Sequence, residues 1–154
     1  MKHQLTNKVL KEVSEPVTIK DNAEHIEDLI KSMWHIVRGN NPEKRAGVGI
    51  AANQVGVLKR VIILNTSTIK RVFINPEIIK ASKNSLKYKE GCLSFPPEDT
   101  RVMTRAKQVT VQALDEKLEP FKMKLRGLDS VCVQHEIDHL NGITIFDGRK
   151  NETT

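Results

Sequence analysis

The pentapeptide His135-Glu136-Ile137-Asp138-His139 constrains this chain more than any other feature of its sequence. Two histidines four residues apart lie one turn apart on the same face of an α-helix, so both imidazoles can reach one metal ion. Glu136 lies beside the first histidine, where its carboxylate can act on a water at that metal without binding the metal. The pattern therefore predicts a helix that carries part of a metal site. The alternative is a surface helix with two solvated histidines.

A catalytic metal usually takes three protein ligands and leaves one position open. A zincin-like third histidine would stand at position 145, which is Ile145, and the only glutamate after the helix is Glu152. Cys132 would lie about 10 Å along the helix from His139, so we interpret it as a small buried hydrophobic residue. Cys92 comes from a distant segment and can approach from the open side. A thiolate and two imidazoles suit Fe(II), Co(II), Ni(II) or Zn(II).

The remaining sequence predicts an α+β fold. Apolar residues recur at helical spacing over residues 22–38, which predicts an amphipathic N-terminal helix with its apolar stripe in the core. Helical spacing returns over residues 128–140 and ends at Asn141-Gly142. Between the helices, a hairpin connection is expected at residues 115–120. Short β-prone runs predict strands at residues 60–64, 71–74, 101–104, 109–113 and 121–125.

Length and composition fit one domain with its own core, which we place at residues 1–147, followed by a short polar tail at residues 148–154. No apolar run approaches the roughly 18 residues of a membrane helix, and the N-terminus does not resemble a signal peptide, so we expect a cytoplasmic protein. The net charge is +6. A cluster of lysines has two interpretations. It is either an ordinary solvated surface or a surface that attracts an anionic partner, such as the ribosome. It comprises Lys80, Lys83, Lys87 and Lys89.

Three motifs give the chain a resemblance to a known family. They are GVGIAANQ at residues 47–54, EGCLS at residues 90–94 and QHEIDH at residues 134–139. In these motifs the chain resembles the peptide deformylases, which carry G-x-G-x-A-A-x-Q, E-G-C-L-S and Q-H-E-x-D-H in this order. The resemblance extends from the first helix to Phe146-Asp147. The short tail is similar to that of truncated members, which include bacteriophage-encoded ones.

The resemblance implies removal of the N-terminal formyl group from formyl-methionyl nascent peptides, with release of formate. It implies antiparallel strands wrapped around a central H-E-x-x-H helix. It also implies one divalent metal per chain, held by Cys92, His135 and His139. The family's native metal is usually Fe2+, for which Zn2+, Ni2+ or Co2+ can substitute.

The resemblance also assigns roles around the metal. Glu136 is the general base and then the general acid, and Gln54 and the backbone N–H of Leu93 stabilise the developing oxyanion. Gly49 lies on a strand along which a peptide can pair by its backbone. The remaining substrate-binding residues implied are Val48, Tyr88, Leu128 and Val131 around the methionine side chain, with the ring of His135, and Arg101 on the substrate backbone.

Several neighbouring residues have expected supporting roles. Asp138 either orients a histidine or the nearby backbone, or is a solvated helix charge. The family pattern implies an ion pair between Glu90 and Arg105 that braces the Cys92 segment. Asn53 is expected to face away from the site, and residues 38–46 are expected to form an exposed loop.

Two other functions fit parts of this pattern. One is a different metal-dependent amidase or peptidase on the same scaffold. The other is a non-catalytic basic module with a structural metal that binds RNA or the ribosome, which would need a fourth protein ligand. Under the deformylase interpretation the partner is a formyl-Met nascent peptide, with a weak ribosome contact through the basic surface. No membrane or DNA partner is expected.

Overall fold

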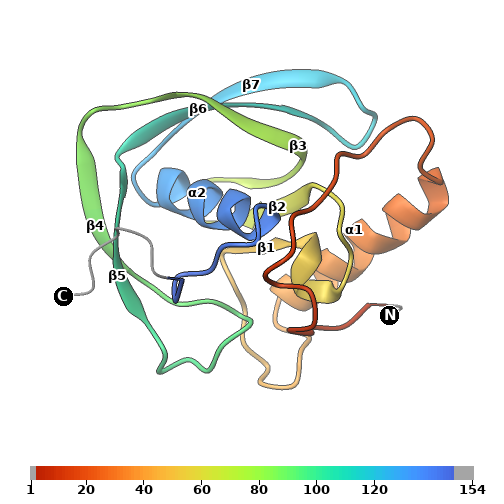
Figure 1. Cartoon of the computed structure of the whole chain (residues 1–154), viewed down its shortest axis with the longest axis horizontal. Helices are drawn as coiled ribbons and strands as arrows, with labels where there is room; N and C mark the ends of the chain where they lie inside the picture. Colours follow the sequence, from red (N-terminus) through yellow and green to blue (C-terminus); the bar gives the residue numbers. More distant parts are fainter. Residues whose placement is uncertain (1–2, 148–154) are drawn as a thin grey trace.

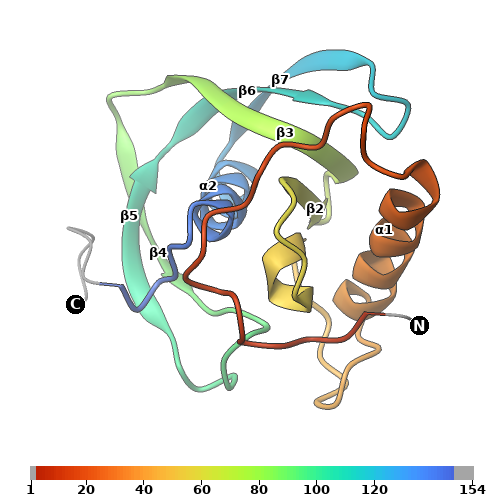
Figure 2. The same cartoon turned by 45° about the vertical axis from the view of Figure 1, so that its right-hand side comes forward.

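The helix predicted from the histidine spacing lies at the centre of the molecule. In the computed structural model, which describes residues 3–147, this helix is α2, Leu128–Leu140. Strands pass around it on several sides, and the first helix, α1 (Ala23–Val37), lies outside them (Figures 1 and 2). The predicted tail at residues 148–154 lies outside the described residues. Among residues 3–147, no helix combines the length and the apolar character that crossing a bilayer requires.

All strand pairs are antiparallel and form two sheets. The larger sheet has the order β1-β2-β3-β6-β7, and β4 and β5 form a second, two-stranded sheet. A short 3₁₀-helix, η1 (Ala52–Val55), follows β1 directly. The strands are β1 Gly49–Ala51, β2 Val61–Asn65, β3 Lys70–Ala81, β4 Ser85–Glu90, β5 Arg101–Ala106, β6 Gln108–Leu114 and β7 Pro120–Arg126. The mixed fold with antiparallel sheets and two helices confirms the predicted α+β class.

Two differences from the predicted strands have physical reasons. β3 continues past residue 74 to Ala81, because a register shift between Ile74 and Glu77 accommodates Asn75 and Pro76. Asn75 has a φ of 52°, and its side-chain amide exchanges two hydrogen bonds of 2.9 Å with the backbone of Val17. The turn-forming residues at 75–76 therefore bend the strand without ending it.

Strand β4 was not predicted at all. Its sequence, SLKYKE, has only two large apolar side chains, and four of its six residues are exposed, so burial does not alternate along the strand. It is nevertheless paired with β5 along its whole length, from Ser85 opposite Ala106 to Glu90 opposite Arg101. Backbone pairing with a partner strand stabilises β4, and no local pattern of burial reveals it.

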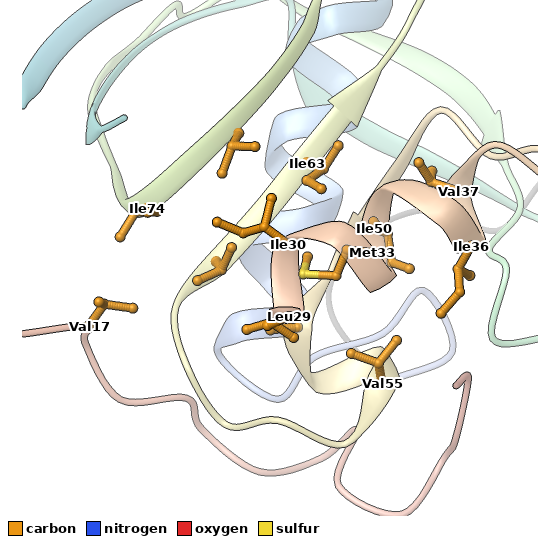
Figure 3. Close-up of a cluster of buried hydrophobic side chains, with 13 residues drawn as sticks. Val17, Leu29, Ile30, Met33, Ile36, Val37, Ile50, Val55, Ile63 and Ile74 are labelled. Atoms are coloured by element: carbon orange, nitrogen blue, oxygen red, sulfur yellow. The ribbon is translucent and has the colours of Figure 1, made fainter. Parts of the chain in front are cut away.

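The core consists of two clusters of apolar side chains that share strand β2. Val61 and Ile63 pack with α1 in the first cluster, which Figure 3 shows around Met33. Ile62 and Leu64 point the other way, into the cluster beneath α2. Both faces of β2 are buried, which explains why its sequence is a continuous apolar run.

Gly142 ends α2 and provides a stability test. Its φ is +75°, and an added Cβ would lie 2.6 Å from the backbone oxygen of Lys11. We expect Gly142→Ala to lower the free energy of unfolding by about 2–5 kcal/mol, since left-handed strain costs roughly 1–2 kcal/mol and overpacking about 1–3 kcal/mol. Urea denaturation would measure this change.

Gly56 offers a matched control for that measurement. Its φ is +83°, but an added Cβ would meet only the side-chain methyl of Thr6, at 3.3 Å. Gly56→Ala should therefore cost only the backbone strain, about 1–2 kcal/mol. Equal costs for the two variants would show that the contact with Lys11 does not constrain position 142.

Candidate active site

The fold brings the three predicted metal ligands together. The ligand atoms of Cys92, His135 and His139 all lie within 4.8 Å of one another, and Cys92 Sγ is 3.3 Å from His139 Nε2. Ligands around a tetrahedral ion with bonds of about 2.0–2.3 Å lie roughly 3–4 Å apart, so the donor set fits one transition-metal ion. Within residues 3–147 this group has three members, and Cys132 is not one of them.

The orientation of His135 is set by a chain of buried charges. Glu90 Oε1 lies 2.8 Å from His135 Nδ1, which leaves Nε2 for the metal. Arg105 donates two hydrogen bonds of 2.8 Å to Glu90 and one of 2.7 Å to Asp138. The expected ion pair between Glu90 and Arg105 is therefore present. Of the two roles left open for Asp138, solvated charge is excluded, because the carboxylate anchors Arg105 to α2.

This chain of charges keeps Glu90 ionised. Burial opposes the charge, but the hydrogen bonds from Arg105 and His135 outweigh it and hold the pKa of Glu90 below its ordinary value. A carboxylate beside Nδ1 strengthens the histidine as a ligand through its other nitrogen. The second sheet contributes to the site through Glu90 at the end of β4 and Arg105 on β5.

Glu136 is buried against the backbone of β1. An added Cβ on Gly49 would lie 2.7 Å from Glu136 Oε2, so only glycine allows the carboxyl group its place. Burial is the main cause that raises the pKa of Glu136 to about 7. Its Oε1 has no hydrogen-bond partner among the described residues, as expected of a group that serves water or substrate. A carboxyl group with a pKa near neutrality can both accept and return a proton.

Gln54 on η1 is held from both ends of its amide. Its Oε1 accepts a hydrogen bond of 2.9 Å from Ala51 N–H, and its Nε2 donates one of 2.9 Å to Ser94 Oγ. The same Nε2 lies 3.6 Å from Cys92 Sγ. The structure thus places Gln54 beside the metal ligands, with its donor group toward the Cys92 segment that also contains Leu93.

Asn53 was expected to face away from the site, and it is indeed absent from the lining of the cavity beside the metal ligands, but it contacts the backbone of a metal ligand. Because the residue lies in a 3₁₀-helix and not in an alternating strand, its side chain is fully buried, and its Nδ2 donates to the backbone oxygen of His139. Asn53 therefore joins the segment of Gln54 to the end of α2. A motif read as an extended strand could not reveal this contact.

Arg45 is a second supporting residue that the sequence did not predict. Residues 38–46 do form a mainly exposed loop, but Arg45 is half-buried. Its Nη2 donates to the backbone oxygens of Cys92, at 2.9 Å, and Phe95, at 2.6 Å. The loop thereby supports the metal-ligand segment across 47 positions of sequence, and no local pattern marks such a contact.

A cavity of about 310 Å³ opens beside the candidate metal site. His135, Glu136 and Cys92 form part of its wall. Arg101 is not in its lining, and its guanidinium lies 5.1 Å from the ring centroid of Phe146. The predicted contact of Arg101 with substrate stays a prediction. The other predicted substrate-binding residues all line the cavity, namely Val48, Gly49, Tyr88, Leu128 and Val131.

Three of these lining residues are apolar side chains left open to solvent. Val48, Tyr88 and Leu128 are 47%, 41% and 37% exposed, although most large hydrophobic side chains of the described residues are buried. An exposed apolar group beside a cavity with convergent polar atoms is typical of a binding site.

Comparisons with known proteins agree on one family. The family model described as polypeptide deformylase matches residues 3–154 of this chain. The peptide deformylase of Aquifex aeolicus is 41% identical over 150 residues, which cover 94% of this chain and 83% of the relative.

Solved structures give the same result. The crystal structure of the deformylase from the Vibrio parahaemolyticus bacteriophage VP16T, in complex with actinonin, matches with a TM-score of 0.77 and 35% identity, over 94% of this chain and 100% of that chain. A probable peptide deformylase from Synechococcus phage S-SSM7 matches with a TM-score of 0.80 and 32% identity, over 95% of this chain and 97% of that chain.

The contact between Gly49 and Glu136 can be tested by Gly49→Ala. The added methyl group would displace the carboxyl group that it meets at 2.7 Å. We expect kcat to fall by about 10²-fold, the effect of misplacing a reacting group by roughly 1 Å. Metal content, measured by mass spectrometry of the purified protein, should stay near one ion per chain. Loss of the metal would indicate a collapse of the site and contradict this reason.

The two cysteines should behave differently. Cys92→Ser should lose metal, because a hydroxyl is a far weaker ligand than a thiolate, whereas Cys132→Ser should keep the metal and lose only stability. Burial raises the pKa of Cys132 to about 12, so at pH 8 roughly one thiol in 10⁴ is ionised. Iodoacetamide should therefore modify Cys92 but not Cys132 in the folded, metal-free protein, with the modified sites identified by mass spectrometry. Modification of Cys132 below pH 10 would contradict this assignment.

Proposed function

The chain belongs to the peptide deformylase family, and on this premise we propose that it removes the N-terminal formyl group from formyl-methionyl nascent peptides, with release of formate. The observation that carries the proposal is the convergence of Cys92, His135 and His139 with Glu136 beside one cavity. We further propose the family arrangement for the fold, in which antiparallel strands wrap around the H-E-x-x-H helix and an amphipathic helix precedes them.

The donor set supports a divalent transition metal, and we propose Fe2+ as the native one, with Zn2+, Ni2+ or Co2+ able to substitute. One thiolate and two imidazoles are suitable ligands for these ions, and three protein ligands leave an open position. When bound, such an ion acts as a Lewis acid that makes water nucleophilic near neutral pH. Glu90 supports the set by orienting the ring of His135.

Glu136 is proposed to move the protons. Its carboxylate would accept a proton from the attacking water and deliver it to the amine nitrogen as the C–N bond of the formamide breaks. The products are formate and a peptide with a free amino terminus, so atoms and charge balance. The raised pKa of Glu136 suits both transfers.

Gln54 and the backbone N–H of Leu93 are proposed to stabilise the negative charge that develops on the formyl oxygen. Ala51 N–H fixes the amide oxygen of Gln54, which keeps its Nε2 on the side of the metal ligands, where it would exchange its contact with Ser94 or Cys92 for the oxyanion. The methionine side chain would lie against the apolar lining of Val48, Leu128 and Val131.

We propose a weak contact with the ribosome through the basic surface, and a cytoplasmic location where nascent peptides are made. The support is that the four lysines named above are all exposed, on β3, β4 and the turn between them. Sedimentation with ribosomes at low and high salt would test the contact, which should weaken as salt rises.

Anaerobic release of formate from a formyl-Met-Ala peptide tests the proposed function. Wild-type protein loaded with Fe2+ or Ni2+ should release formate, and Glu136→Ala should abolish turnover while keeping about one metal per chain, because Glu136 serves the water and not the metal. Gln54→Ala should lower kcat on the order of 10²-fold, as for other oxyanion donors.

Acetyl-Met-Ala and unblocked Met-Ala peptides serve as controls in the same assay. A general amidase or peptidase would also cleave these, whereas a deformylase should release formate from the formyl peptide alone. Full activity of Glu136→Ala would contradict the assigned role, and no formate release by any metal form would contradict the proposed function.

A further inference from the structure

The cavity carries positive charge that the proposed reaction does not use. Arg45 and Lys89 both belong to its lining. Within residues 3–147, no carboxylate forms an ion pair with either of them. Lys89 is exposed on β4, and Arg45 is half-buried at the end of the loop that precedes β1.

The acidic residues of the lining do not neutralise this charge. Glu90 is engaged by Arg105 and His135, both at 2.8 Å. Glu136 is buried against Gly49, where the proposed reaction already uses its carboxyl group. An incoming peptide therefore meets two basic side chains and no exposed carboxylate among the described lining residues.

Arg45 is already held in place before any ligand binds. Both of its hydrogen bonds to carbonyl oxygens come from Nη2, so three of the five N–H groups of the guanidinium, on Nη1 and Nε, remain for another acceptor. A side chain fixed in this way loses little conformational entropy when it binds a carboxylate. Its partial burial also weakens screening by solvent.

The apolar and the basic residues of the lining suit different parts of a bound peptide. Val48, Leu128 and Val131 suit the methionine side chain and offer nothing to an acidic group. Successive residues of an extended peptide advance by about 3.3 Å, so the second and third residues lie within reach of a long basic side chain. The basic residues can therefore contact the residues of the peptide that follow the methionine.

We propose that this enzyme prefers formyl-methionyl peptides that carry an acidic side chain at the second or third residue, through Arg45 and Lys89. The inference rests on the proposed deformylase function and names the substrate class for the same site. The recognised chemistry is a carboxylate. A side chain is the source proposed, because a nascent peptide has no free C-terminus while it is being made.

The test compares kcat/KM for formyl-Met-Glu-Ala and formyl-Met-Ala-Glu with the matching glutamine peptides, all with amidated C-termini. At low salt we expect at least one glutamate peptide to exceed its glutamine partner by about 3- to 10-fold, the effect of one or two partly exposed ion pairs. The ratio should approach one as salt is raised. A glutamine peptide with a free C-terminus shows how much a terminal carboxylate contributes.

Lys89→Gln should reduce the glutamate-to-glutamine ratio by about 2- to 5-fold. Lys124→Gln is the matched control, since it removes the same charge from an exposed position on β7, outside the cavity lining, and should leave the ratio unchanged. Arg45→Lys keeps the charge and should retain most of the preference. Arg45→Gln should reduce it, with metal content measured because Arg45 also supports Cys92.

The possible failures are distinguishable. No formate from any peptide, the glutamine peptides included, would refute the proposed function itself. Formate release with equal kcat/KM for glutamate and glutamine peptides at low salt would refute the acidic preference and leave the deformylase function intact. A preference that survives both Lys89→Gln and Arg45→Gln would show that other residues cause it, and would overturn the assignment.

Discussion

Arg105 is the residue on which the arrangement of the site depends. Its guanidinium is buried between the second sheet and α2, where it pairs with Glu90 and Asp138. A charge buried without partners costs several kcal/mol, so these three groups can be buried only together. Their mutual pairing holds β5 against the helix, and Glu90 Oε1, which accepts from Arg105, also lies 2.8 Å from His135 Nδ1. The geometry of the metal ligands therefore depends on an ion pair that touches no metal.

Much of this architecture was predictable because the determining interactions are local or periodic. The four-residue spacing of His135 and His139 specifies a helix and a shared face, and apolar periodicity specifies α1. Cys92 could be inferred by elimination and by its motif. Four of the five predicted strands were found because their apolar residues face one of the two core clusters.

The features that were missed depend on partners far away in the sequence. Strand β4 exists because β5 pairs with it, and its own residues are mostly exposed. Asn53 binds a backbone oxygen 86 positions away, and Arg45 binds two backbone oxygens about 50 positions away. A backbone acceptor has no side-chain identity, so neither contact leaves a trace in a single sequence. Only the folded chain reveals that both residues support the metal ligands.

The burial of β2 on both faces has a consequence for how the molecule loses its structure. Val61 and Ile63 serve one cluster, and Ile62 and Leu64 serve the other. Removing α1 would expose one face of the strand that supports the other cluster, so the two halves of the core cannot melt independently. Such a chain unfolds as one cooperative unit, and the amide hydrogens of β2 exchange with solvent only through global unfolding. Helix α2, which packs on the second cluster and carries His135 and His139, is then lost only with the whole fold.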